Sequence, residues 1–255
     1  MSDEAGRPLL EVCVDDAAGL AAAVAGGADR IELCASLEMG GVTPSAGLMA
    51  EASRLEIPVV ALIRPRSGGF VYAAAEERAM CGDVERAAAL GLAGVAIGAL
   101  TGAGGLDLAL LERLAAHAAG LQLTLHRAFD LVRDPAEALE QAIALGFKRV
   151  LTSGGAVHAP DGAARLAALV ARSRGRIAIL AGSGIRPDNV ATLLAATGVP
   201  EVHASCRAPG PAPAPELIAF GFAAAPARAT SAAVVRELKA RLLAHARSAR
   251  PAPPP

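Results

Sequence analysis

Lysine is nearly missing from this chain: Lys148 and Lys239 are the only two among 255 residues. Enzymes that form a Schiff base with a carbonyl substrate or with pyridoxal phosphate need a lysine amine at the reacting centre. Lys148 opens a strand-like run and Lys239 falls in the last helical segment, so neither is placed for that chemistry. A Walker-type glycine loop is also missing. These absences exclude a Schiff-base aldolase, a pyridoxal-phosphate enzyme and a P-loop nucleotide hydrolase.

Cysteines and long apolar runs are few as well. The cysteines are too scattered for a disulfide scaffold and none belongs to a CxxC pair; they are Cys13, Cys34, Cys81 and Cys206. Asp3 and Glu4 stand where a signal peptide carries basic residues, and no apolar run approaches the roughly 18 residues of a membrane span. We therefore expect a cytoplasmic protein with reduced thiols and no membrane partner.

The charge of the chain is low and nearly balanced. The formal net charge is −1, with 19% charged and 53% hydrophobic residues. Proteins that bind nucleic acid usually carry a basic surface, so we expect no nucleic-acid partner. A chain of this length and hydrophobicity can bury one large core, and α/β barrels often have about this size.

Strand-like runs recur eight times, and each is followed by a helical stretch. The runs lie at 9–14, 29–34, 57–63, 93–98, 121–126, 148–152, 176–181 and 200–205. Helix-start signals at Asp16, Asp134-Pro135 and Pro187 predict helices over 17–25, 135–145 and 187–197. Eight repeated β/α units predict an α/β fold, a single-domain TIM-type (β/α)₈ barrel.

The predicted barrel extends over residues 9–247. Residues 1–8 form an N-terminal extension, and the proline-rich tail 248–255 is expected to be disordered. A second proline-rich passage, 209–215, connects the last strand to a final helix near 231–247.

A carboxylate and a thiol are paired in each of the first two strands. Glu11 shares a strand face with Cys13, and Glu32 shares one with Cys34, because side chains two positions apart point the same way. The apolar residues between them suit the outer, helix-covered face. The polar set therefore points into the space that the strands enclose.

The active site of a (β/α)₈ barrel lies at the carboxyl ends of its strands. Polar residues gather at those predicted ends: Glu11, Cys13, Glu32, Cys34, Arg64, Arg66, His126, Arg127, Asp130, Thr152, Ser153, Gly182 to Gly184, His203 and Ser205. The opposite ends carry charges that we expect to be solvated: Arg30, Lys148, Arg149 and Arg176.

The carboxylates and the histidine are compatible with an enzyme. Glu11, Glu32 and His126 are candidate acids and bases for proton transfer, because burial raises the pKa of a glutamate toward neutrality. The alternative is a structural ion network in which Arg64 and Arg127 neutralise the two glutamates. Charge and spacing leave both possibilities open.

A third signal indicates anion binding. In many barrels the loops after the seventh and eighth strands hold a phosphate through backbone N–H groups. The candidate residues are Arg64, Arg127, Gly182, Ser183, Gly184 and Ser205. The loop 64–77, with Phe70 and Tyr72, is either a lid over the ligand or an ordinary surface or subunit contact.

Seven strings of the sequence resemble the CutC family, the cytoplasmic copper homeostasis proteins. They lie at 11–15 (EVCVD), 26–34 (GGADRIELC), 40–45 (GGVTPS), 63–66 (IRPR), 126–130 (HRAFD), 149–154 (RVLTSG) and 182–185 (GSGI). The resemblance covers about residues 9–207 and implies a TIM-type barrel, often a homo-oligomer, with a role in copper handling. It implies no particular catalytic activity.

The copper role that this resemblance implies directs attention to the thiols. Copper(I) prefers soft sulfur ligands, so Cys13 and Cys34 are the candidate metal ligands, with His126 or His203 as further donors. The alternative is that both are small buried core residues. Near the eighth strand the family reads His-Cys-Ser-Ala-Arg, whereas this chain has its cysteine two positions later, at Cys206. The sequence therefore predicts either a copper ion or a small anionic ligand as the partner.

Overall fold

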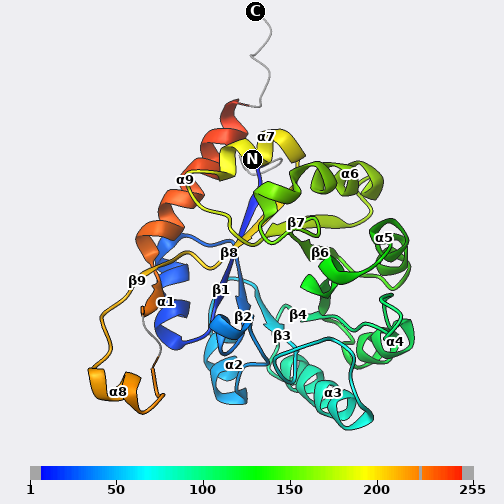
Figure 1. Cartoon of the computed structure of the whole chain (residues 1–255), viewed down its shortest axis with the longest axis horizontal. Coiled ribbons are helices and arrows are strands. Elements are labelled where there is room, and N and C mark those ends of the chain that lie inside the picture. The colour runs from blue at the N-terminus through cyan, green and yellow to red at the C-terminus, as the bar shows by residue number, and fades with distance from the viewer. Residues whose placement is uncertain (1–6, 224–225, 249–255) are drawn as a thin grey trace, which may run out of the picture.

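Eight parallel strands close into a barrel in the order β1 to β8, with helices around it (Figure 1). The computed structural model describes residues 7–223 and 226–248. The strands are β1 (Leu9–Val14), β2 (Arg30–Leu33), β3 (Val59–Leu62), β4 (Gly94–Ile97), β5 (Gln122–Leu125), β6 (Arg149–Thr152), β7 (Ala178–Gly182) and β8 (Glu201–Ala204). The predicted (β/α)₈ barrel is confirmed.

Helices follow the strands and form the outer layer. They are α1 (Ala17–Gly26), α2 (Ala46–Ala52), α3 (Ala74–Ala89), α4 (Leu108–His117), α5 (Pro135–Ala144), α6 (Ala163–Ser173), α7 (Val190–Thr197), α8 (Pro215–Ala219) and α9 (Ala232–Ser248). Short 3-10 turns occupy Leu37–Met39, Arg127–Leu131 and Ala159–Gly162.

Helix-start residues act as predicted at two of three places. Asp16 accepts a hydrogen bond from the Gly19 N–H at the start of α1, and Asp134 accepts two at the start of α5. The prediction at Pro187 was wrong, because α7 begins three residues later, at Val190. The Asn189 side chain instead binds the loop, accepting from the Arg186 N–H and donating to the Gly184 carbonyl. The loop after β7 is therefore longer than predicted.

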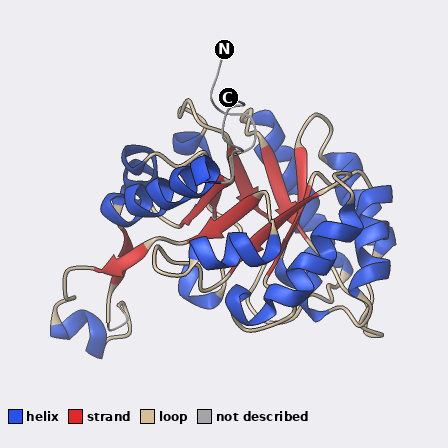
Figure 2. Cartoon of the chain, turned by 90° about the horizontal axis from the view of Figure 1, so that it is seen from above, coloured by secondary structure: helices blue, strands red, loops and turns tan. Residues whose placement is uncertain are grey.

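Helices cover the outside of the strands (Figure 2), and both strands and helices contribute residues to the main apolar core. Val12, Val14, Ile31 and Leu33 are fully buried in it, as strand alternation predicts. Truncating such a leucine to alanine typically costs about 2–5 kcal/mol. A second, smaller apolar cluster, Cys34, Val60, Leu62 and Ala96, lies apart from this core.

Two arginines at the amino ends of the strands are not solvated, contrary to the sequence prediction. Arg30 is 4% exposed and Arg149 is 7% exposed. Arg30 forms ion pairs with Glu11 and Glu201, and Arg149 forms one with Glu201. Because burying a guanidinium is favourable only beside a counter-charge, the interior carboxylates explain why these side chains turn inward.

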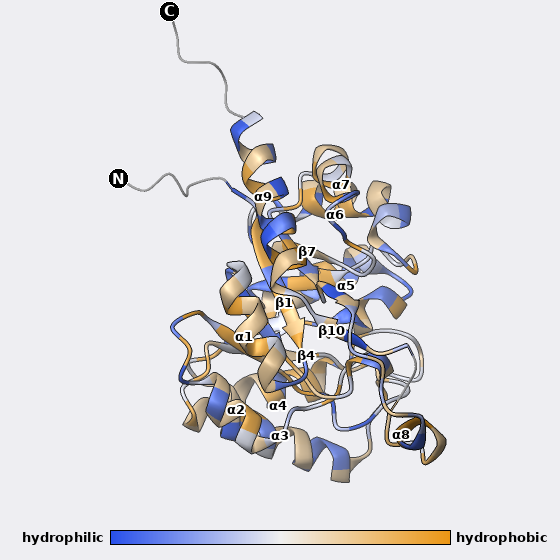
Figure 3. Ribbon diagram, turned by 90° about the vertical axis from the view of Figure 1, so that its left-hand side faces the viewer, coloured by the Kyte–Doolittle hydropathy of each residue, from blue (hydrophilic) through white to orange (hydrophobic). Residues whose placement is uncertain are grey.

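An arm extends from the barrel after β8. It consists of the described residues from Arg207 to Thr230: β9 (Arg207–Pro209), helix α8, and β10 (Arg228–Thr230), which pairs antiparallel with β9. Figures 1 and 3 show α8 standing away from the barrel. The predicted extension 1–8 and tail 248–255 lie almost entirely outside the described residues. Among the described helices, none is both long and apolar enough to cross a membrane.

Candidate functional site

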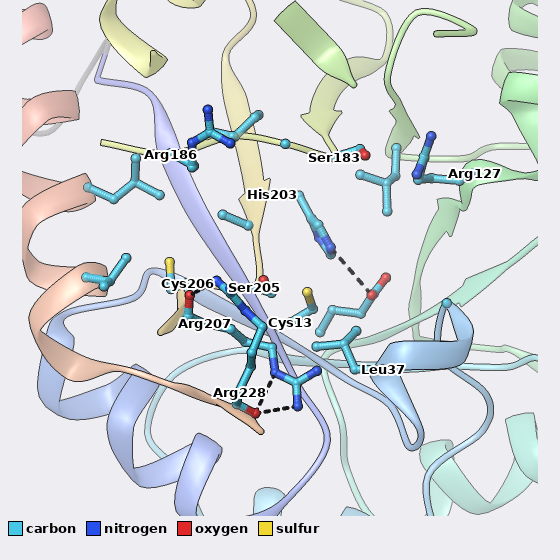
Figure 4. A pocket seen from close by; sticks show the side chains of 18 of the residues that line it. Cys13, Leu37, Arg127, Ser183, Arg186, His203, Ser205, Cys206, Arg207 and Arg228 are labelled. Atoms are coloured by element: carbon cyan, nitrogen blue, oxygen red, sulfur yellow. Dashed lines mark hydrogen bonds and ion pairs between the residues drawn. The ribbon is translucent and has the colours of Figure 1, made fainter. Parts of the chain in front are cut away.

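A cavity of about 960 Å³ opens at the carboxyl ends of the strands (Figure 4). Of the twelve residues proposed for catalysis, anion binding or metal binding, it brings together nine: Cys13, Glu32, Arg64, His126, Arg127, Ser183, Gly184, His203 and Ser205. Three other candidates, Glu11, Cys34 and Gly182, are not among the residues that line it. The predicted location of the site follows from the barrel, and most of its predicted members share one cavity.

His203 occupies the centre of the polar set. Its Nδ1–H donates to Glu11 Oε1 at 2.8 Å, and its Nε2 lies 3.8 Å from Glu32 Oε2. The register of the barrel explains the first contact, since Glu11 on β1 is the direct lateral partner of His203 on β8. Figure 4 shows the imidazole pointing into the cavity. Glu11, Glu32 and His203 offer ligand atoms that all lie within 4.8 Å of one another.

The environment gives these three groups different protonation behaviour. Burial opposes ionisation of Glu11, but the Arg30 charge and the His203 hydrogen bond lower the pKa of Glu11 to about 2. Burial raises the pKa of Glu32 to about 7, with the Glu11 charge adding to it and His203 and Arg30 opposing. For His203, burial lowers the pKa, but Cys13, Glu32 and Glu11 raise it well above 6.5.

A buried ion network stabilises the charge of Glu11. Arg30 contacts both Glu11 and Glu201, and Arg149 contacts Glu201, so carboxylates and guanidinium groups alternate along the barrel interior. This ion network differs from the predicted one, in which Arg64 and Arg127 neutralised the glutamates. Its effect is to keep Glu11 ionised, and Glu11 in turn orients the His203 ring.

His126 lies at the end of β5 and is 4% exposed. Its Nδ1 accepts a hydrogen bond from the Ala128 N–H at 3.2 Å, so the ring proton is on Nε2. Burial and the charge of Arg64 lower the pKa of His126 to about 3. His126 is therefore a neutral imidazole at physiological pH. It is better suited to donate a hydrogen bond than to act as the base that the sequence predicted.

Arg64 organises two loops rather than standing free in the cavity. Its guanidinium donates to the backbone carbonyls of Met39, Gly41 and Gly68, at 3.2, 2.7 and 2.8 Å. The same group lies over the Phe70 ring at 5.1 Å, and Phe70 packs against His126 with 5.1 Å between ring centroids. Arg64 thus fixes the loop 64–73 above His126.

Arg127 presents its guanidinium more openly, with 40% of the side chain exposed. It donates to Asp130 at 2.8 Å and to the Ser153 hydroxyl at 2.9 Å. Asp130 also accepts from the N–H groups of Ser153 and Gly155, both at 3.0 Å, and so orders the loop after β6.

Two residues of the predicted glycine turn adopt left-handed backbone. Ser183 has φ 78° and Gly184 has φ 71°. A Cβ on Gly184 would lie 2.9 Å from the His158 ring, so glycine is required there. The Ser183 hydroxyl donates to the Val157 carbonyl at 2.8 Å, which ties the loop after β7 to the loop after β6.

The thiols fall in different surroundings. Cys13 and Cys206 line the cavity, and Figure 4 shows both beside Ser205. Cys34 instead donates to the Val14 carbonyl at 3.4 Å, and burial together with the Glu32 charge raises its pKa. The predicted eighth strand, 200–205, ends earlier than expected: β8 ends at Ala204, so Cys206 lies beyond the strand, with φ 47°. Burial raises the pKa of Cys206 to about 12.

Sequence reasoning underrated His203 and missed Arg30 and Glu201 as its supports. His203 was recognised at a strand end, but its contact with Glu11 depends on which residues of β1 and β8 are lateral neighbours. Barrel closure sets that register, and no local sequence pattern in β1 or β8 predicts it. The only available signal was the position of His203 on a strand next to β1.

Together these features define a TIM-type barrel with a polar cavity built around a glutamate–histidine pair. The CutC family profile matches residues 8–208. The family protein CutC of Sinorhizobium medicae is 55% identical over 236 residues, covering 92% of this chain and 96% of that protein. The one from Caulobacter vibrioides is 54% identical over 235 residues, covering 91% and 96%. The chain belongs to the CutC family.

Solved structures agree with this assignment. A crystal structure of CutC from Streptococcus agalactiae, whose name proposes a role in copper homeostasis, has a TM-score of 0.75 and 33% identity, covering 78% of this chain and 98% of that one. Thiamine phosphate pyrophosphorylase from Pyrococcus furiosus has a TM-score of 0.60 at 17% identity, covering 94% and 98%. The second likeness reflects the barrel fold alone.

Proposed function

We propose that this CutC-family barrel is an enzyme that transfers protons on a small anionic substrate. The observation that carries the proposal is the placement of His203 between Glu11 and Glu32, at the floor of the cavity. Glu11 and Glu32 are two ionisable groups whose environments push their pKa values apart. Such pairs are typical of an active site that contains an acid and a base.

The roles follow from the contacts. Glu11 stays ionised and orients His203, whose Nε2–H faces Glu32 and the cavity. The pKa of Glu32, about 7, makes it an effective base near neutral pH, because the catalytic optimum lies close to the operating pH. His203, protonated at that pH, is the matching acid.

An anionic substrate is supported by the charge of the cavity wall. Six arginines line it, Arg64, Arg127, Arg186, Arg207, Arg228 and Arg241, against four carboxylates, Glu32, Glu38, Asp188 and Glu237. A cleft with an excess of one charge attracts the opposite charge and raises its local concentration. Ser183, Gly184 and Ser205 add polar groups from the loops after β7 and β8, where many barrels hold phosphate.

Turnover of candidate substrates tests the enzyme proposal. The protein is incubated in D₂O with a panel of sugar phosphates and phosphorylated hydroxy and keto acids, and conversion or deuterium uptake is followed by ¹H and ³¹P NMR. We expect activity on at least one compound, and a loss of at least a hundredfold in Glu32→Gln. Activity that is unchanged in Glu32→Gln would contradict the role of Glu32.

Copper(I) binding is the second candidate function, and the place of Cys13 supports it. The Cys13 thiol lines the same cavity as His203, where a soft sulfur and an imidazole can both reach a copper ion. Support for Cys34 as the second ligand is weaker, because its thiol is bonded to the Val14 carbonyl inside an apolar cluster. The name of the Streptococcus agalactiae relative agrees with a copper role.

Self-association and a cytoplasmic location complete the proposal. The tip of the arm exposes Phe220 and Phe222, at 75% and 80%, with their rings stacked at 6.3 Å between centroids. Leu217 and Ile218 of the same segment are exposed as well. A contiguous exposed apolar patch marks a protein contact site, and we infer that the arm contacts a second copy of the chain. The few, scattered cysteines support a cytoplasmic location.

A further inference from the structure

His126 carries a buried polar atom whose pairing is incomplete. Its Nε2 finds no hydrogen-bond partner among residues 7–223 and 226–248. The hydrogen bond from Ala128 to Nδ1 fixes the proton on Nε2, so the atom without a partner is a donor. A buried donor left unsatisfied costs about 1–3 kcal/mol, which makes it a feature that requires an explanation.

Glu32 has a complementary atom in the same cavity. Its Oε2 faces His203, but its Oε1 has no hydrogen-bond partner in the described part of the chain. Glu32 is buried, with only 6% of its surface exposed. Glu32 and His126 both line the cavity. One donor and one acceptor without partners among the described residues thus belong to residues that line the same cavity.

The position of His126 is enforced by its neighbours. A Cβ on Gly98 would lie 2.4 Å from both Nδ1 and Cε1 of the His126 ring, so glycine at position 98 makes room for the imidazole. Phe70 packs against the ring from the loop that Arg64 holds. The chain therefore fixes a neutral imidazole in one orientation, as a preorganised hydrogen-bond donor requires.

We infer that the substrate is an anionic aldehyde or ketone, that Glu32 removes a proton from the carbon next to its carbonyl, and that His126 Nε2–H hydrogen-bonds the carbonyl oxygen. This inference rests on the proposed proton-transfer function and adds the substrate class and the role of His126. A neutral imidazole suits this role because it polarises a carbonyl without giving up its proton. Its depressed pKa agrees with the geometry.

The step balances without any co-reactant. The C–H proton moves to Glu32, the electron pair of that bond forms a C=C bond, and the carbonyl π pair moves to oxygen, giving an enolate. The His126 Nε2–H group stabilises the negative oxygen. Return of the proton to the same carbon completes a racemisation. Where that carbon also carries a hydroxyl, the His203 imidazolium can protonate the enolate oxygen to give an enediol; transfer of the other hydroxyl proton back to His203 and of the Glu32 proton to the former carbonyl carbon then completes an isomerisation.

The test compares two ligands of the same phosphate type. Phosphoglycolohydroxamate mimics a planar enediolate, whereas phosphoglycolate presents a carboxylate, and both are titrated calorimetrically into the full-length protein. We expect the hydroxamate to bind at least tenfold more tightly in the unaltered chain, because transition-state mimics gain the interactions made to the developing charge. In His126→Phe, which keeps a ring but loses the donor, the two ligands should bind about equally tightly.

Two further variants separate a functional donor from a structural one. His126→Gln retains an amide donor and should recover part of the hydroxamate preference, and Gly98→Ala should remove it by displacing the ring while leaving every polar group present. His117→Phe, on the exposed face of α4, is the matched control. A preference that survives in His126→Phe overturns the inference. If neither ligand binds the unaltered chain, the proposed anionic substrate is overturned and this inference with it.

Discussion

His203 Nδ1 lies 2.8 Å from Glu11 Oε1, across the seam where β8 closes the barrel onto β1. The two residues are 192 positions apart in the chain. Their contact places an ionised carboxylate behind an imidazole, and Arg30 holds that carboxylate from the other side. Glu11 and Glu32 thus have different roles, one supporting and one reactive, although each lies on a strand, two positions before a cysteine.

Glu11 should be structurally indispensable. In Glu11→Gln, Arg30 and His203 lose a buried counter-charge, and breaking a buried ion pair from one side typically costs about 3–5 kcal/mol. Urea unfolding midpoints measure this loss. Glu140→Gln, which weakens the exposed pair with Arg176, is the control and should change the unfolding midpoint much less, because solvent screens exposed ion pairs. A loss in Glu11→Gln as small as in the control would contradict a supporting role for Glu11.

Glu32 should behave in the opposite way, with a clear pH dependence. Its pKa is about 7 in the folded chain against 4.5 ordinarily, so folding favours the protonated form. This contribution to stability is complete below pH 4.5 and is lost as the pH rises through 7. Glu32→Gln removes this pH dependence. Between pH 4.5 and pH 8, the free energy of unfolding of the variant should therefore rise by about 2–4 kcal/mol relative to that of the wild type. Parallel stability–pH curves would contradict the raised pKa.

Phosphate should stabilise the folded chain through the cavity. At ten times its dissociation constant, a ligand that binds only the folded state adds about 1.4 kcal/mol, which corresponds to roughly 2–5 °C in melting temperature. Arg127→Met should remove most of this shift. Arg64→Ala is a poorer test, because Arg64 also holds the loops together.

Arg113→Met, on α4 and paired with Glu77, is the control for the phosphate experiment. It removes an arginine that does not line the cavity, so the phosphate shift should remain. Equal shifts in Arg127→Met and Arg113→Met would indicate a general salt effect and would contradict the anion site.

Copper(I) should bind once per chain if the second candidate function is correct. In an anaerobic titration against a competing chelator, Cys13→Ser should abolish binding. Cys34→Ser should weaken it, because the Cys34 thiol has to leave the Val14 carbonyl to reach the ion. Cys81→Ser, on α3, is the control. Binding that is unchanged in both Cys13→Ser and Cys34→Ser would rule out this site.

The arm should mediate self-association. Sedimentation velocity of the unaltered chain is expected to show an oligomer, and the double variant Phe220→Ser, Phe222→Ser should shift it toward the monomer, since both rings are exposed. Val157→Ser alters an exposed apolar side chain elsewhere and should leave the oligomer intact. A monomeric unaltered chain would contradict the proposal.

The sequence by itself determined the barrel, because each β/α unit is a local pattern. Strand-like apolar runs, each followed by a helical stretch, repeat eight times, and eight such units have few other ways to bury their faces. The same reasoning placed polar groups at the carboxyl ends of the strands. Cavity members such as Glu32 and His126 were therefore found without the tertiary structure.

Only the tertiary structure decided which polar groups meet and what each can do. The register between β8 and β1 pairs His203 with Glu11, and the inward turn of Arg30 and Arg149 supplies the buried counter-charges. Protonation follows from those contacts: two glutamates of one sequence motif acquire pKa values of about 2 and about 7. Burial and partner charges act through space, so residues distant in sequence set properties that no local pattern encodes.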